Sequence, residues 1–155
     1  MNELVYRNLS EDAKRQICAW KYGGEYDLYN LPAYEEMQVR QIGFMNPQRE
    51  KNYYGFWDES ILVGFVNILE EKEEVFIGIG VNPDLCNKHY GQRMLSITYE
   101  ISKKLYPNKP LYLEVRTWNI RAVKCYQKAG FRIDGQAYEL TTGIGTGTFY
   151  RMIRE

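Results

Sequence analysis

The spacing of hydrophobic residues changes several times along the chain, and each change marks a predicted element. A short apolar stretch at residues 4–7 predicts a strand, and a helical pattern follows at residues 11–21 behind the N-cap candidate Ser10. A turn-rich loop at residues 22–32 separates it from a second helical pattern at residues 33–42. The N-terminal part should therefore form one strand followed by two helices.

The middle of the chain is rich in β-branched and aromatic residues. Three such segments, at residues 53–58, 60–70 and 74–81, are separated by short polar turns, which predicts three consecutive antiparallel strands. After Pro83 the apolar residues recur at helical spacing until Pro107, which predicts one long helix.

The C-terminal part repeats the change from strand to helix. Residues 110–117 alternate as a strand, and a compact helix should run from the N-cap Asn119 to Gly130. Two further strands at residues 131–140 and 148–155, joined by a glycine-rich turn, should close the fold as a hairpin.

Composition and charge limit the class of protein. The 155 residues are 45% hydrophobic, enough for one buried core, so we expect a single domain at residues 1–155. Twenty basic residues balance twenty acidic ones, which gives no general attraction to nucleic acid or to an anionic membrane. No run of 18 uncharged apolar residues occurs, and three separate cysteines indicate free thiols in a reducing compartment. We expect a cytoplasmic protein without nucleic-acid or membrane partners.

The segment "CNKHYGQ" at residues 86–92 contains the only histidine. Backbone N–H groups at a helix start bind anions, and Lys88, Gly91 and Gln92 suit a phosphate. Alternatives are an ordinary turn, a nucleophilic pair of Cys86 and His89, which needs a third orienting group, and a metal site. One His and three scattered Cys do not make a zinc site, so we expect no metal.

The segment "LEVRTWNIRAVKCYQKAGFRIDG" resembles a conserved block of the GNAT superfamily of acetyl-CoA-dependent N-acetyltransferases. The pattern N-x-x-A-x-x-x-Y-x-x-x-G-F is met by Asn119, Ala122, Tyr126, Gly130 and Phe131. Upstream, "VNPDLCNKHYGQRML" is similar to the acetyl-CoA loop of the family, matching it at Val81, Pro83 and Gly91. Cys86 stands where Gln or Arg is usual, and His89 stands where Gly is usual. The resemblance extends from about residue 61 to residue 131.

This resemblance implies an α/β (α+β) domain. Its mixed, mostly antiparallel sheet should have about seven strands and about four flanking helices, and the fourth and fifth strands should splay into an acetyl-CoA cleft. Backbone groups of Ile79 and Val81 would hold the pantetheine, and Gly78 and Gly80 suit either a closely approached strand or ordinary strand packing. The remaining cofactor-binding candidates are Cys86, Asn87, Lys88, His89, Tyr90, Gly91 and Gln92 in the loop, and Asn119, Ala122 and Tyr126 on the later helix.

The implied reaction is acetyl transfer to a primary amine of a small molecule or peptide, directly within a ternary complex. An ammonium must first lose its proton, and Glu74 or Glu114 would accept it, unless both are solvated strand charges. Tyr126 would protonate the leaving thiolate, unless it only packs. The alternative function is a catalytically weak acyl-CoA-binding sensor. The partners are acetyl-CoA and an amine acceptor, and a homodimer is allowed. The aromatic and acidic residues at 20–36 suit a cationic acceptor or a packing role.

Overall fold

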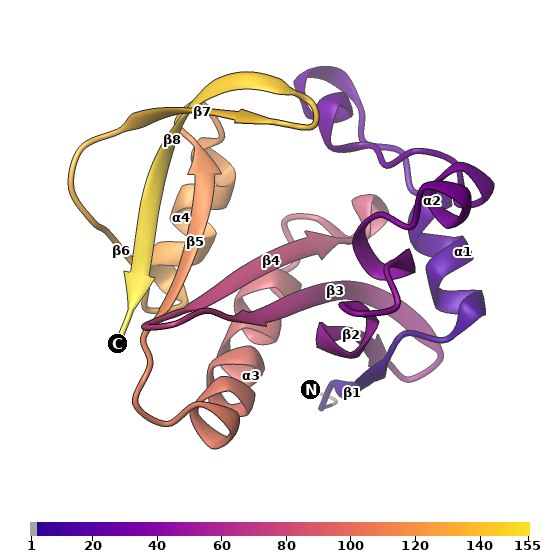
Figure 1. The fold of residues 1–155 in the computed structure, drawn as a ribbon, viewed down its shortest axis with the longest axis horizontal. Coiled ribbons are helices and arrows are strands. Elements are labelled where there is room, and N and C mark those ends of the chain that lie inside the picture. The colour runs from indigo at the N-terminus through magenta and orange to yellow at the C-terminus, as the bar shows by residue number, and fades with distance from the viewer. Residues whose placement is uncertain (1–2) are drawn as a thin grey trace. The chain divides into compact units, whose positions relative to one another are not determined.

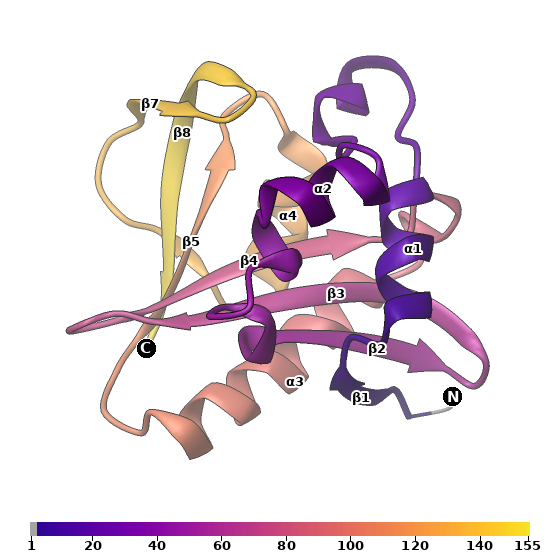
Figure 2. The same ribbon diagram turned by 45° about the vertical axis from the view of Figure 1, so that its right-hand side comes forward.

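The computed structural model describes residues 3–155 as alternating helices and strands (Figures 1 and 2). The helices are α1 (Glu11–Ala19), α2 (Tyr34–Arg40), α3 (Tyr90–Leu105) and α4 (Ile120–Lys128). The strands are β1 (Val5–Asn8), β2 (Tyr53–Asp58), β3 (Ile61–Glu70), β4 (Val75–Val81), β5 (Leu111–Arg116), β6 (Arg132–Ile133), β7 (Tyr138–Thr142) and β8 (Gly145–Arg154). Short 3-10 helices at Gly24–Tyr29, Gly43–Met45, Glu50–Asn52 and Pro83–Leu85 lie in the connections.

The strands pair in the order β1-β2-β3-β4-β5-β8-β6, and β7 pairs with β8. The β4/β5 pair is parallel, whereas β1/β2, β2/β3, β5/β8, β6/β8 and β7/β8 are antiparallel. Pairing of β4 with β5 covers only Val75↔Leu111 and Phe76↔Tyr112, as expected for two strands that splay. The mixed, mostly antiparallel sheet with four α-helices among the described residues confirms the predicted fold class.

Several boundaries differ from the sequence prediction. The described sheet has eight strands rather than about seven, because the expected strand at residues 131–140 divides into β6 and β7. Gly135 lies in this break with φ 79°, a left-handed conformation that interrupts the extended backbone. Helix α2 ends at Arg40 rather than at Ile42, because Gln41 is also left-handed, with φ 52°. Helix α1 ends at Ala19, where Trp20 becomes extended.

The first compact unit comprises residues 1–67 and 79–90 and is described from residue 3. Its core packs α1 and α2 through buried apolar side chains that include Ala13, Ile17, Cys18 and Met37. A Cβ on Gly80 of β4 would lie 2.4 Å from the ring of Phe65. Packing therefore explains the glycine at position 80, because the Phe65 ring occupies the space that a side chain would need.

The second compact unit comprises residues 68–78 and 91–155. Side chains on β5 alternate, with Leu111, Leu113 and Val115 buried, and these face the same side as their β8 partners Arg154, Met152 and Tyr150. Arg154 donates to the Ala129 carbonyl after α4 and lies over the ring of Tyr99 in α3. This side therefore faces the helices.

The opposite side of β5 bears Tyr112, Glu114 and Arg116 and is called here the outer face of β5. The expectation of a single domain at residues 1–155 stays a prediction.

Candidate active site

The loop that follows β4 is fixed by the side chain of Asn82. Its Oδ1 accepts a hydrogen bond from the Asp84 N–H at 3.0 Å, and its Nδ2 donates to the Leu62 carbonyl of β3 at 3.1 Å. The Cys86 thiol lies 3.7 Å from the Asn82 carbonyl and can donate to it. The start of the predicted phosphate loop is thus attached to β3 within the first unit.

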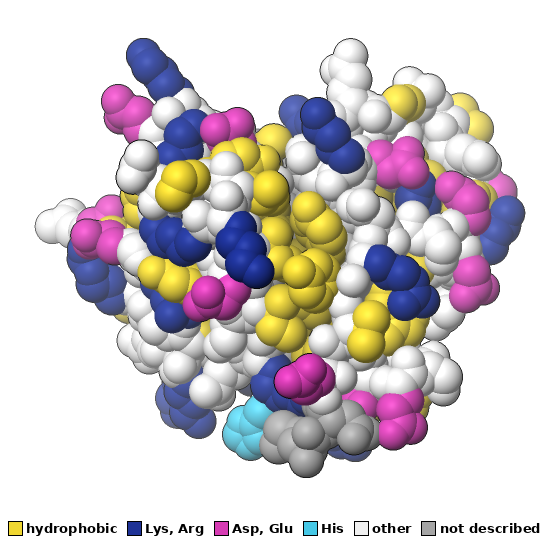
Figure 3. Space-filling view, turned by 90° about the horizontal axis from the view of Figure 1, so that it is seen from below, with side chains coloured by type: hydrophobic (Ala, Val, Ile, Leu, Met, Phe, Trp, Pro, Cys, Tyr) yellow, Lys and Arg dark blue, Asp and Glu magenta, His cyan; other side chains and the backbone are white. Residues whose placement is uncertain are grey.

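Two non-glycine residues of this loop have left-handed backbones. Asn87 has φ 65° and His89 has φ 66°. The His89 side chain is exposed, and it is the histidine coloured cyan in Figure 3. Glycine adopts this conformation at no steric cost, and glycine is the residue that the GNAT pattern has at this position. The loop therefore keeps a glycine-like backbone although the glycine itself is missing.

We expect His89→Gly to raise the melting temperature slightly and to leave acetyl-CoA binding unchanged or tighter. Relief of the left-handed strain, partly offset by added chain entropy, should amount to about 1 kcal/mol or less. Thermal denaturation and calorimetry would measure both effects. Lys88→Gly is the control, because Lys88 has no positive φ and should only lose stability. A more than tenfold weaker Kd for acetyl-CoA in His89→Gly would mean that the imidazole itself contacts the ligand.

The C-terminal end of β4 presents a backbone carbonyl on the side away from β3. The Asn82 N–H donates to the Val63 carbonyl at 2.9 Å, so the preceding carbonyl, that of Val81, points the opposite way across the trans peptide. The hydroxyl of Tyr22, from the loop after α1, donates to this carbonyl at 2.6 Å. Sequence reasoning placed Tyr22 among the acceptor-side aromatics and missed this contact, which no spacing signal across 59 residues could reveal.

We expect Tyr22→Phe to tighten acetyl-CoA binding by up to about fivefold, the value of one net hydrogen bond. The reason is that the Val81 carbonyl, which we expect to accept from the pantetheine, would lose a competing donor. Calorimetry would measure the Kd. Tyr99→Phe is the matched control, because it removes another tyrosine hydroxyl that donates to a backbone carbonyl, that of Glu155 at 2.8 Å. Weaker binding in Tyr22→Phe would instead show that Tyr22 helps to hold the strand end in its binding conformation.

In the second unit, the conserved-pattern residues of α4 have clear local roles. Asn119 is the N-cap as predicted, since its Oδ1 accepts from the Ala122 N–H at 3.2 Å. Gly130 follows the helix end with φ 95°, and a Cβ there would lie 3.0 Å from the side chain of Arg154. Tyr126 is half-buried, and its carbonyl accepts from Phe131 at 3.0 Å. These contacts fix the backbone on which the Tyr126 phenol is carried.

The structure distinguishes the two candidate bases, which sequence reasoning treated alike. Both oxygens of Glu74 accept from Arg151, at 2.5 and 3.1 Å, and Arg151 also bonds Asp134. These hydrogen bonds, the one to Glu74 first, raise the pKa of Arg151 above its usual value, although partial burial opposes them. Glu74 is therefore held in an ion pair with a permanent cation.

Glu114, on the outer face of β5, accepts its side-chain hydrogen bond from a neutral group, although Arg151 is its cross-strand partner in β8. The hydroxyl of Tyr138 in β7 donates to Glu114 Oε2 at 2.5 Å. Burial, and then this hydrogen bond, raise the pKa of Tyr138, so the phenol stays protonated and keeps donating. Tyr138 is a site residue that sequence reasoning missed, because β7 was expected as part of one longer strand.

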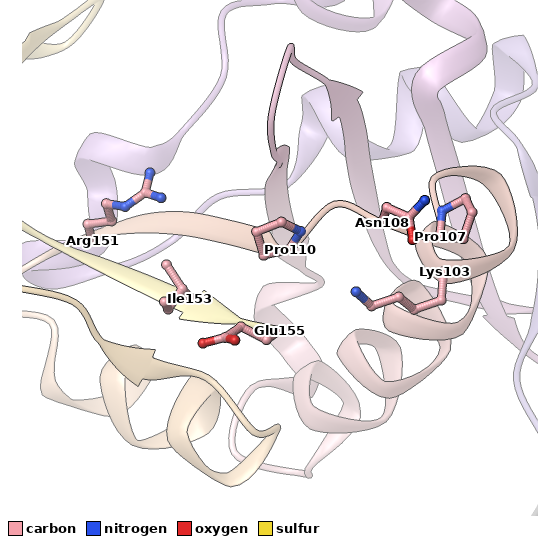
Figure 4. Close-up of a pocket in the computed structure, with 7 residues that line it drawn as sticks. All are labelled: Lys103, Pro107, Asn108, Pro110, Arg151, Ile153 and Glu155. Atoms are coloured by element: carbon pink, nitrogen blue, oxygen red, sulfur yellow. The ribbon is translucent and has the colours of Figure 1, made fainter.

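A pocket of about 400 Å³ opens in the second unit, but it holds none of the predicted site residues (Figure 4). Pro110, just before β5, lines it, whereas Glu114 and Asn119 lie toward and beyond the other end of that strand. Its lining residues are Lys103, Pro107, Asn108, Pro110, Arg151, Ile153 and Glu155. Of its lining residues, Arg151 bonds Glu74 and lies opposite Glu114 in the β5/β8 register, so the pocket borders the candidate bases without containing them.

Two absences concern only residues 3–155. No helix in this range is long and apolar enough to cross a membrane. Within the same residues, no three His, Cys, Asp or Glu side chains are placed to hold a metal ion together. The expected absence of a metal stays a prediction.

Comparison with known proteins identifies the family. The sequence matches the model of the acetyltransferase (GNAT) family over residues 10–131. The chain therefore belongs to the GNAT family, and it is an acetyltransferase by that membership. The comparison with curated protein sequences gave no match.

Solved structures with low sequence identity share the fold. Spermidine N-acetyltransferase from Vibrio cholerae, in complex with CoA and spermine, has TM-score 0.77 and 18% identity, with 97% of this chain and 94% of that chain covered. AAC(6')-Ib in complex with ribostamycin and coenzyme A has TM-score 0.75 and 16% identity, covering 99% and 93%. A GNAT-family acetyltransferase from Bacillus anthracis has TM-score 0.79 and 17% identity, covering 98% and 94%. At these identities the likeness establishes the fold.

Proposed function

We propose that this protein transfers the acetyl group of acetyl-CoA to a primary amine of a small molecule or peptide, directly within a ternary complex. The observation that carries the proposal is the family match over residues 10–131, which includes the loop before α3 and Tyr126 of α4. The named ligands of two structural neighbours, spermine and ribostamycin, are amines and support this acceptor class.

The backbone at the proposed co-substrate site supports binding of acetyl-CoA. Ile79 and Val81 would supply strand-edge groups for the pantetheine amides, since the Val81 carbonyl points away from β3. Backbone N–H groups of residues 86–92, at the start of the 16-residue helix α3, would hold the pyrophosphate. Asn119, Ala122 and Tyr126 would border the thioester end. Acetyl-CoA supplies the activated acetyl group, and the side chains below handle the protons.

In the reaction, the Glu114 carboxylate accepts a proton from the acceptor ammonium and leaves a neutral amine. The amine nitrogen forms a bond to the acetyl carbon as the carbon–sulfur bond breaks. The Tyr126 hydroxyl gives its proton to the departing sulfur. The excess proton on the new amide nitrogen passes through solvent to the Tyr126 phenolate and restores the phenol, while Glu114 releases its proton to water. We prefer Glu114 to Glu74 because Arg151 engages both oxygens of Glu74.

The sensor alternative depended on the changed residues of the phosphate loop. Cys86 and His89 depart from the pattern, but the backbone at His89 is left-handed, as a glycine would be. A change of side chain that leaves the backbone conformation in place does not by itself imply lost turnover. No observation favours the sensor over the enzyme.

The test has two parts, calorimetry with acetyl-CoA and an assay of thiol release with polyamines, amino acids, aminoglycosides and peptides. We expect a micromolar Kd and thiol release with at least one amine. No binding at millimolar acetyl-CoA would overturn the proposal. Binding without thiol release across the whole panel would favour the sensor.

Three further expectations remain part of the proposal. We infer that the protein works in the cytoplasm, because three widely spaced cysteines indicate free thiols in a reducing compartment. We also infer that it acts without a nucleic-acid or membrane partner, because its charge is balanced. The homodimer also stays a prediction. Sedimentation of the purified protein would measure its oligomeric state.

A further inference from the structure

Arg116, at the end of β5, is a buried arginine whose guanidinium is held by packing against β8. Arg116 is 8% exposed, and its guanidinium carbon lies 4.8 Å from the ring centroid of Phe149 in β8. A Cβ on Gly147, also in β8, would lie 2.0 Å from Arg116 Nη1. The guanidinium therefore lies against an aromatic ring and in space that only a glycine leaves open.

The charge of Arg116 is not matched by the protein. Among residues 3–155, no carboxylate forms an ion pair with Arg116 and no side-chain hydrogen bond to it is found. Other arginines of the second unit do have partners, such as Glu74 for Arg151 and Glu155 for Arg132. A buried charge without a counter-ion is costly, which favours binding of an anion at this position.

The Arg116 guanidinium is not fully enclosed despite its burial. The fully enclosed polar side-chain atoms without a partner, among the described residues, are Asn67 Oδ1 and Ser102 Oγ. The nitrogens of Arg116 are not among them, although they make no hydrogen bond, so they keep contact with solvent. Arginine presents a planar fork of N–H donors that matches the two oxygens of a carboxylate.

The neighbour of Arg116 on the same face is Glu114. The two residues are two positions apart on the outer face of β5, which separates their backbones by about 6.6 Å along the strand. Glu114 is held through one oxygen by Tyr138 and forms no ion pair among residues 3–155. The carboxylate of Glu114 and the guanidinium of Arg116 thus lie on the same face without a direct ion pair between them, and Arg151 is the residue opposite Glu114 in β8.

We propose that the acceptor is an amino acid or short peptide with a free carboxylate, and that Arg116 binds this carboxylate while Glu114 receives the ammonium. The inference rests on the proposed acetyl transfer and adds the substrate class. It differs from what spermine or ribostamycin would need, because neither carries a carboxylate for Arg116. A polycation placed on this face would leave the guanidinium unpaired and be repelled by it.

The experiment compares pairs of amines that differ only by a carboxylate: L-lysine with cadaverine, L-ornithine with putrescine, and L-phenylalanine with phenethylamine. Calorimetry on the CoA-saturated protein gives each Kd, and thiol release from acetyl-CoA gives each kcat/KM. We expect the amino acid of at least one pair to bind at least about tenfold more tightly than its decarboxylated partner, the scale of one charged hydrogen-bonded contact.

Variants then assign this preference to Arg116. Arg116→Gln should raise the Kd of the preferred amino acid about tenfold and leave that of its decarboxylated partner unchanged. Arg116→Lys keeps the positive charge but lacks the paired N–H donors of the guanidinium. Its Kd for the preferred amino acid should lie between those of the wild type and Arg116→Gln. Arg132→Gln, at an exposed ion pair on β6, is the control and should leave the Kd of the amino acid and that of its decarboxylated partner unchanged.

Some outcomes would overturn the inference. They are equal or tighter binding of the decarboxylated amine in every pair, binding of neither member of any pair, or an equal loss for both members in Arg116→Gln. The comparison on the wild-type protein decides the matter even if a variant fails to fold. Failure of the proposed function looks different, because acetyl-CoA itself would then not bind.

Discussion

Tyr126→Phe should lower kcat about 10²-fold, the usual contribution of a general acid, while the Kd of acetyl-CoA changes by less than about twofold. The substitution removes one hydroxyl and keeps the half-buried ring. Because the backbone carbonyl of Tyr126 still accepts from Phe131, the end of α4 should stay intact. Steady-state kinetics with a good acceptor and calorimetry with acetyl-CoA measure the two quantities.

Tyr106→Phe, after the end of α3, is the matched control and should keep normal turnover. A tyrosine that only packs would give the opposite result in Tyr126→Phe, a lower melting temperature with near-normal kcat in the folded fraction. If the variant kept more than half of the wild-type kcat, Tyr126 would not be the acid and another donor would have to protonate the sulfur.

Sequence reasoning succeeded where structure is determined by neighbouring residues. The start of α4 follows from Asn119 because an N-cap side chain bonds the backbone only three residues away, and the bond to Ala122 is the one expected. Likewise, the end of the same helix follows from Gly130, which takes the left-handed conformation that glycine accepts most easily.

Sequence reasoning failed where structure depends on contacts between distant residues, or where a short segment could form either one strand or two. The segment at residues 131–140 alternates well enough for one strand, but a turn at Gly135 divides it. The bonds from Tyr22 to Val81 and from Tyr138 to Glu114 join residues that are 59 and 24 positions apart. Tyrosine is common in cores and at surfaces, so no local signal distinguishes these two from the other twelve.

The same limit applies to the charges of the site. Glu74 and Glu114 have similar surroundings in sequence, since each lies in or beside an apolar strand. The structure gives Glu74 a cation, Arg151, and gives Glu114 a neutral phenol. Strand order and register place Arg151 of β8 directly opposite Glu114 of β5, yet its guanidinium bonds Glu74 beside β4. The partner therefore depends on side-chain conformation as well as on strand order, and neither can be read from the local sequence.

Glu114→Gln should lower kcat/KM for the acceptor by about 10²-fold or more if Glu114 is the base. The amide keeps the shape of the side chain, and its oxygen can still accept from Tyr138, so packing on the outer face should survive. Glu74→Gln is the matched control. It weakens the ion pair with Arg151 and should lower the melting temperature, while kcat/KM changes less than about fivefold.

The pH dependence separates a base from a merely structural carboxylate. An alkyl amine with a pKa of about 10.4 is almost fully protonated at pH 7, and its neutral fraction rises about tenfold with each pH unit below that pKa. Without a base, the reaction can use only this neutral fraction, so the rate of Glu114→Gln should keep rising with pH toward 10. The rate of the wild type should level off at a lower pH, and the ratio of the wild-type rate to the Glu114→Gln rate should fall at high pH. A ratio of the two rates that does not change with pH would mean that Glu114 supports the structure of the site and is not the base. A normal rate in Glu114→Gln together with a large loss in Glu74→Gln would assign the base to Glu74, even though it is paired with Arg151.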